Sequence, residues 1–153
     1  MSSEDFKREF NISAKIIYRE WLMEAIKNDD YKSFRDCVLN LGTEWHVIRT
    51  VEKDNQDNFC KNLWDNRKKI QNGTYNWWTG APSYKSKVCF LINPQYYKLI
   101  YDSKNRDALH EENCKPANWH DIVDKYYEEH KLEKDVEKIF EIDYYLWNKE
   151  KQS

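Results

Sequence analysis

Residues 80–109 read GAPSYKSKVCFLINPQYYKLIYDSKNRDAL and carry an ordered succession of turn and helix signals. The turn-forming residues Gly80 and Pro82 come first, and Ser83 then provides a possible cap for a helix that reaches Asn93. Because the residue before a proline avoids the helical conformation, the proline at position 94 predicts that this helix ends nearby. The stretch therefore begins with a turn and one short apolar helix.

The second half of this stretch predicts an extended segment and another helix. Residues 95–101 are apolar and β-branched enough to form a short extended piece. Asp102 and Ser103 follow as an N-cap signal for a helix that continues through Leu109. An aspartate in such a cap contributes about 1 kcal/mol to stability by itself.

Apolar residues recur at three- and four-residue intervals over most of the remaining chain, as they do on one face of an amphipathic helix. Gly42 and the pair Asn72-Gly73 are plausible stops between such segments. No repeat, low-complexity tract or linker interrupts the pattern. The expected helices, about seven in number, cover residues 11–26, 31–41, 59–70, 83–93, 103–109, 118–126 and 132–147.

The composition favours the same architecture. The chain has 153 residues, a usual length for one domain, and its 7 Trp, 11 Tyr and 6 Phe supply the bulky side chains of a packed core. Only 3 Gly and 3 Pro occur, whereas sandwiches, barrels and doubly wound sheets need these residues at many tight turns. We therefore predict an all-α fold in which residues 1–153 form a single compact helical domain.

The charge and the N-terminal sequence restrict the partners and the location. The formal net charge is −2, so a contact with nucleic acid must come from a local patch rather than from the field of the whole molecule. Residues 1–6 lack the basic start and apolar core of a secretory signal, and no stretch approaches the roughly 18 apolar residues of a membrane span. We expect a soluble intracellular protein, cytoplasmic or nuclear, with no membrane partner.

The sequence predicts neither a metal site nor an organic cofactor. The four cysteines are widely spaced and include no Cys-x-x-Cys pair, and the four histidines never form the i, i+4 couple that places two imidazoles on one helical face. Glycine-rich phosphate loops and Gly-x-Ser-x-Gly elbows do not occur in the sequence. The commoner nucleotide-binding and hydrolase classes are therefore excluded.

The order of elements in residues 80–109 resembles the core of the helix-hairpin-helix DNA glycosylase superfamily. In that superfamily a hairpin is followed by a helix that begins with lysine, and a hydrophobic run leads to an aspartate at the start of the next helix. This chain has Gly80, then Lys87, then Asp102 in the corresponding order. The closing segment 139–147 is similar to the terminal helix of small uncharacterised relatives of these enzymes.

The resemblance implies a protein that binds double-stranded DNA, flips out a damaged or modified base and cleaves its N-glycosidic bond. Asp102 would be the catalytic carboxylate that stabilises the positive charge growing on the sugar. Lys87, with Lys85 as the alternative, would be the second catalytic residue, a nucleophile that forms a Schiff base if a lyase step follows. The helix start after Gly80 would hold a phosphate through its backbone amides, a contact that does not read sequence. The nucleic-acid-binding residues implied in this way are Gly80, Ser83, Tyr84, Lys85, Ser86, Lys104, Arg106, Trp77 and Trp78.

Other interpretations of the same residues stay open. Asp102 can be an ordinary helix cap, Trp77 and Trp78 can pack in the core at a helix junction, and the lysines can form a solvated face. The chain would then be a non-catalytic helical module that binds DNA or another protein. Arg106 and His110, if they lie on one helix, also resemble the Arg and His of HEPN ribonucleases, which cleave RNA.

Overall fold

The structure, a computed structural model, describes residues 2–149, and this part of the chain is helical without any β-strand. The prediction of an all-α chain is confirmed for these residues. None of the described helices is both long and apolar enough to cross a bilayer. The elements are α1 (Ser3–Lys27), α2 (Tyr31–Glu44), the 3-10 turns η1 (Ile48–Thr50) and η2 (Lys53–Asn55), α3 (Gln56–Asp65), α4 (Arg67–Asn72), α5 (Pro82–Ile92), α6 (Pro94–Tyr97), α7 (Ser103–Ala108), α8 (Pro116–Glu129) and α9 (Val136–Lys149).

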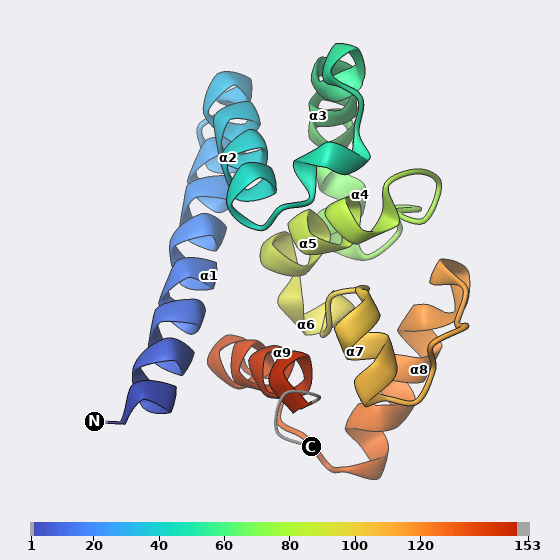
Figure 1. The fold of residues 1–153 in the computed structure, drawn as a ribbon. Helices are drawn as coiled ribbons and strands as arrows, with labels where there is room; N and C mark the ends of the chain where they lie inside the picture. Colours follow the sequence, from blue (N-terminus) through green and yellow to red (C-terminus); the bar gives the residue numbers. More distant parts are fainter. Residues whose placement is uncertain (1, 150–153) are drawn as a thin grey trace.

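The other elements surround α5, which lies in the middle of the molecule (Figure 1). The long helix α1 forms one flank, α2 lies against α1, and α3 packs on α2. Helix α5 contacts α1, α4 and α6, while α9 contacts α1, α6 and α7. Every residue of α5 from Tyr84 to Ile92 is buried. This explains why the second half of α5 is apolar on all sides instead of carrying one apolar stripe.

Helix α1 begins well before Asn11, where the apolar pattern first predicted a helix. Ser2 is its N-cap, and the Ser2 hydroxyl accepts a hydrogen bond from the Asp5 N–H at 3.1 Å. The first turns leave Phe6 and Phe10 exposed to solvent. The apolar periodicity therefore marks only the buried part of α1, and a capped polar start extends the helix beyond it.

Two other predicted elements are wrong in their detail, for local reasons. The helix expected at residues 59–70 is interrupted at Asn66, where the backbone leaves the helical region, and is divided into α3 and α4. The extended piece expected at 95–101 begins instead with the helical turn α6, which Asn93 caps. Lys98 then ends this turn in a left-handed conformation with φ 52°. These two features account for nine α-helices in the described residues where about seven were expected.

Gly42 lies inside α2 and does not end it, contrary to the prediction from its position as a stop signal. A Cβ atom at position 42 would lie 2.1 Å from the Tyr84 hydroxyl oxygen, so only glycine fits there. The Tyr84 ring is fully buried, and its hydroxyl donates a hydrogen bond to the carbonyl of Val38 at 2.5 Å. The glycine thus permits a direct bond between α5 and the backbone of α2.

Residues 98–102 connect α6 to α7 and are held from the side of α8. The Trp119 indole N–H donates to the carbonyl of Leu99 at 3.1 Å, and the Tyr127 hydroxyl donates to the carbonyl of Lys98 at 3.2 Å. Both aromatic side chains are almost fully buried. Because buried backbone carbonyls need such partners, these bonds restrain the segment that leads to the start of α7.

Candidate functional site

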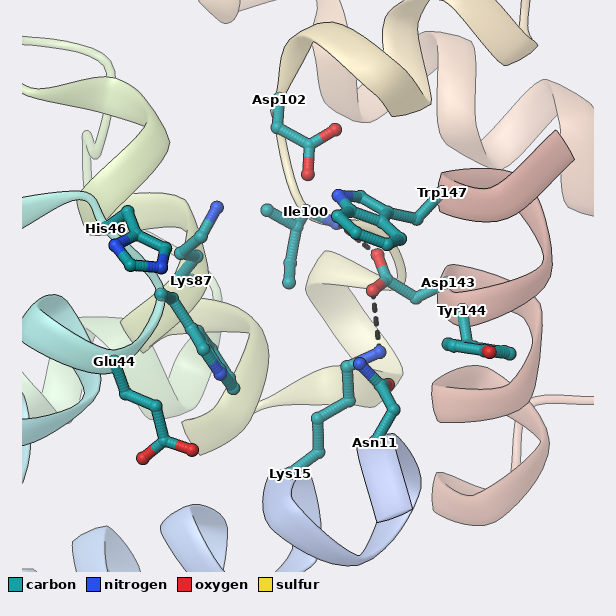
Figure 2. Close-up of a pocket in the computed structure, with 11 residues that line it drawn as sticks. Asn11, Lys15, Glu44, His46, Lys87, Ile100, Asp102, Asp143, Tyr144 and Trp147 are labelled. Atoms are coloured by element: carbon teal, nitrogen blue, oxygen red, sulfur yellow. Dashed lines mark hydrogen bonds and ion pairs between the residues drawn. The ribbon is translucent and has the colours of Figure 1, made fainter. Parts of the chain in front are cut away.

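A pocket of about 280 Å³ lies where α1, α5, α9 and the start of α7 meet the end of α2. Its charged lining residues are Lys15, Lys87, Glu44, Asp102 and Asp143. Aromatic and imidazole rings form much of the remaining wall, from Trp45, His46, Tyr144 and Trp147. The pocket, called here the Asp102 pocket, therefore combines acids, bases and flat apolar surfaces in one small space (Figure 2).

Asp102 is both the N-cap of α7 and a wall of this pocket. Its Oδ1 accepts a hydrogen bond from the Asn105 N–H at 2.7 Å, and its side chain remains partly exposed on the pocket side. Burial, helped by the negative charge of Asp143, raises the pKa of Asp102 to about 6, and the positive charge of Lys87 opposes this rise. At neutral pH the carboxylate is therefore mostly ionised but close to the range in which it exchanges protons.

Lys87 reaches the same pocket from the middle of α5 and is only 8% exposed. Burial lowers the pKa of its ammonium group, while the nearby charges of Asp102 and Asp143 oppose this effect. No hydrogen bond or ion pair of the Lys87 ammonium is found within residues 2–149, and the charged groups that act on it are Asp102, Asp143 and Lys15. A buried amine with a lowered pKa and a free approach to a cavity is suited to nucleophilic or proton-transfer chemistry.

The floor of the pocket is an ion pair between α1 and α9. Lys15 Nζ lies 2.8 Å from Asp143 Oδ2, and each side chain is 4% exposed. The other carboxylate oxygen of Asp143 accepts bonds from the Ile100 N–H at 3.1 Å and from the Asn105 side-chain amide at 3.0 Å. No local sequence pattern contains Lys15 or Asp143, and 128 positions separate them, so the sequence alone did not predict them.

The structure therefore brings together the two predicted catalytic residues, Asp102 and Lys87, and does not bring Lys85 to the same place. Lys85 is 8% exposed, and its Nζ lies 5.9 Å from the centre of the Tyr75 ring. Burial lowers the pKa of the Lys85 ammonium as well. Lys85 therefore lies near Tyr75 and does not line the Asp102 pocket.

Four of the residues predicted to bind nucleic acid are buried, namely Trp77, Tyr84, Lys85 and Ser86. Tyr84 is fully buried against α2, and the Ser86 hydroxyl accepts a bond from the Tyr101 N–H at 3.1 Å. Such side chains have no surface to offer to a DNA strand. Gly80, with φ 151°, and the half-buried Ser83 remain near the surface at the start of α5.

The adjacent tryptophans differ from each other and lie outside the Asp102 pocket. Trp77 is 4% exposed and packs on the Tyr101 ring at 5.4 Å, whereas Trp78 is 39% exposed and meets Trp77 edge-on. The indoles that line the pocket are instead those of Trp45 and Trp147. The interpretation of Trp77 as a core residue is confirmed, and only Trp78 presents a large exposed indole at this place.

Lys104 and Arg106 lie beside the pocket on α7. Lys104 Nζ is 4.3 Å from the centre of the Trp147 ring, so this cation stands against one wall of the pocket. Arg106 covers the Tyr101 ring and donates to the carbonyl of Asp102 at 3.2 Å. His110 lies beyond the end of α7, exposed and with φ 59°. The premise that Arg106 and His110 share one helix is therefore wrong.

Nothing outside the pocket's own residues points to its chemistry. Among residues 2–149, no three His, Cys, Asp or Glu side chains gather as a bound metal ion would require. A scan against protein-family models and searches of curated proteins and of solved structures found no significant match to this chain. Asp102, Lys87 and the groups around them are therefore the features that indicate what this chain does.

Proposed function

We propose that this chain is a DNA glycosylase-like protein that takes an extruded base and its sugar into the Asp102 pocket and cleaves the N-glycosidic bond. The observation that carries the proposal is that Asp102 and Lys87, from separate elements, face one cavity with pKa values shifted towards neutrality in opposite directions. Enzymes create such shifts in groups that exchange protons or attack a substrate.

The shape and lining of the pocket suit a flat, uncharged ring. Its volume of about 280 Å³ is small for a ligand site and excludes a large cofactor. Trp45, Tyr144 and Trp147 offer aromatic surface on which a nucleobase can stack. The pocket also shares these three residues with a neighbouring hollow of about 700 Å³, which gives the rest of a nucleotide room to approach.

In the proposed reaction, the bond between the base nitrogen and C1′ of the sugar breaks, and its electron pair leaves with the base. The Asp102 carboxylate stabilises the positive charge that forms at C1′. Water then bonds to C1′ and transfers one proton to Asp102, and the departing base takes up a proton from the solvent, so that the products are a free base and a sugar with a C1′ hydroxyl. Alternatively, the neutral amine of Lys87 attacks C1′ in place of water and then loses a proton to Asp102, and its lowered pKa makes the neutral amine more abundant.

The proposal is tested by base release from duplex oligonucleotides that carry varied lesions and modified cytosines, followed by alkali and strand analysis. We expect Asp102→Asn to lower the release rate by about 10²–10⁴-fold, the usual contribution of such a group, and to leave DNA binding intact. Asp107→Asn is the matched control, because Asp107 lies on the same helix but does not line the pocket. If no duplex in the set acquires abasic sites, or if both variants behave alike, the proposal is wrong.

A non-catalytic DNA-binding module is the second candidate, and the capping bond of Asp102 favours it. The 2.7 Å bond to the Asn105 N–H gives this carboxylate a complete structural role without any reaction. In that case the wild-type chain binds duplex DNA and never releases a base. Asp102→Asn then changes nothing in DNA binding, because asparagine caps a helix as well as aspartate does.

A further inference from the structure

Asp143 accepts a hydrogen bond from one residue on each side of Asp102. Its Oδ1 accepts from the Ile100 N–H at 3.1 Å, two residues before Asp102, and from the Asn105 side-chain amide at 3.0 Å, three residues after it. Asp143 itself is 3% exposed and belongs to α9, far from this segment in sequence. The position of the segment is therefore fixed by a group outside it.

Asn105 connects the two carboxylates directly. Its backbone N–H donates to Asp102 at 2.7 Å, while its side-chain amide donates to Asp143 and, at 2.9 Å, to the carbonyl of Ile100. Asn105 is fully buried, so water does not compete for these bonds. A movement of Asp143 is thus transmitted to the residue that orients Asp102.

Lys15 completes the arrangement from α1. Its ammonium group, 2.8 Å from Asp143 Oδ2, compensates the charge of a carboxylate that is otherwise removed from water. The Lys15 bond uses the oxygen that the Ile100 and Asn105 bonds leave free. Asp143 therefore has a donor on each oxygen and little freedom to rotate.

We propose that Asp143 is a positioning residue, which holds Asp102 in reaction geometry through Ile100 and Asn105. The inference rests on the proposed function, since it assigns Asp143 a role in the reaction of Asp102. In this role Asp143 is a hydrogen-bond acceptor held in place. The position of Asp102 therefore depends on the Asp143 oxygen that accepts from Ile100 and Asn105, rather than on its charge. A misplacement of about 1 Å at a reacting group lowers a rate by about 10²-fold, which sets the scale of the expected effect.

The test compares two double variants that both remove the ion pair. Lys15→Met with Asp143→Asn keeps an amide oxygen that can accept from Ile100 and Asn105, whereas Lys15→Met with Asp143→Leu removes that acceptor. Native-state hydrogen exchange at the amides of residues 100 and 105 measures local opening of the segment around Asp102, and exchange at the buried Val123 of α8 is the internal control. Single-turnover base release reports the reaction.

We expect the leucine variant to exchange about tenfold or more faster at residues 100 and 105, and to release base about 10²-fold more slowly. The asparagine variant should show exchange and base release close to those of wild type. Exchange at Val123 should be unchanged in both variants. If the leucine variant matches the asparagine variant in exchange and in rate, the inference is overturned. If wild-type protein releases no base but exchange follows this pattern, the proposed function fails while Asp143 still holds the segment.

Asn105→Ala carries the same test if the leucine variant does not fold. It leaves the Lys15–Asp143 pair intact and removes only the amide that bridges Asp143 to the carbonyl of Ile100. We expect faster exchange at residue 100 and slower base release. Wild-type values for both in a folded Asn105→Ala protein would overturn the inference.

Discussion

Lys15 and Asp143 form a buried ion pair with 2.8 Å between their charged atoms, although 128 positions separate them in the chain. The pair joins the first and last described helices under the Asp102 pocket. Burial removes both charges from water, and each charge then depends on the other for compensation. The pair is therefore a point where stability and the geometry of the pocket depend on the same two side chains.

Removing one partner of this pair should be costly. We expect Lys15→Met to lower the free energy of unfolding by about 3–5 kcal/mol, because it leaves the Asp143 carboxylate buried without compensation. Adding Asp143→Asn should recover part of the loss, since asparagine removes the uncompensated charge and keeps an acceptor. Urea unfolding of the two variants measures these free energies. A Lys15→Met protein as stable as wild type would contradict the prediction.

Asp102→Asn should make the protein more stable at neutral pH. Burial raises the pKa of Asp102 from its ordinary 3.8 to about 6, so between these values the folded state binds a proton that the unfolded state does not. The stability that this group contributes to the folded state falls as the pH rises from 3.8 to 6. Asparagine caps α7 as well as aspartate does, so the variant keeps the bond to the Asn105 N–H. The variant should gain roughly 1–3 kcal/mol at pH 7 and nothing below pH 4.

Unfolding curves at several pH values distinguish this outcome from a simple loss of the cap. A lost cap would destabilise the variant by a similar amount at every pH. A variant less stable than wild type at pH 7 would therefore show that Asp102 is not strained by burial.

The two adjacent tryptophans should respond differently to truncation. Trp77→Ala is expected to cost about 3–5 kcal/mol, because this indole is 4% exposed and packs on Tyr101. Trp78→Ala should cost clearly less, since its indole is 39% exposed. Chemical unfolding of both variants gives the comparison. If Trp78 also contacts DNA, as predicted, its variant binds duplex DNA more weakly while remaining folded.

Gly42→Ala should be destabilising even though alanine favours helices. The new Cβ would lie 2.1 Å from the hydroxyl oxygen of the buried Tyr84, which cannot move without losing its bond to Val38. Overpacking of this kind costs about 1–3 kcal/mol. Thr43→Ala is the control, because Thr43 is the next residue of α2 and is exposed. Equal thermal stability of the two variants would contradict the contact.

Local signals in the sequence were sufficient for α5 and α7. The helix expected at 83–93 is found at Pro82–Ile92, and the one expected at 103–109 at Ser103–Ala108. Pro82 at the first position of α5 and the capping Asp102 before α7 act within a few residues of the boundary they set, whereas Ser83, the expected cap of α5, lies inside the helix and Ala81 is its N-cap. The start of α1 was missed because its exposed Phe6 and Phe10 do not follow the buried apolar face.

The pocket could be predicted only in part. Asp102 and Lys87 belong to one stretch of sequence with recognisable order, whereas Lys15, Trp45 and Asp143 come from other elements. Nothing in a local pattern indicates which lysine on an amphipathic helix turns inwards to meet a carboxylate on a distant helix. Such residues are selected by tertiary packing, which a sequence pattern does not contain.

Lys87 lines the Asp102 pocket while only 8% exposed, and burial lowers the pKa of its ammonium group. A compound that offers an acceptor to the ammonium group gains a bond for which the protein has already met the desolvation cost. Occupancy should then appear as a rise in melting temperature, because a ligand at 100 times its Kd adds about 2.7 kcal/mol to stability. Melting curves recorded against nucleosides and bases would therefore reveal what the cavity accepts before any turnover is observed, with Lys87→Met as the protein that should lose the response.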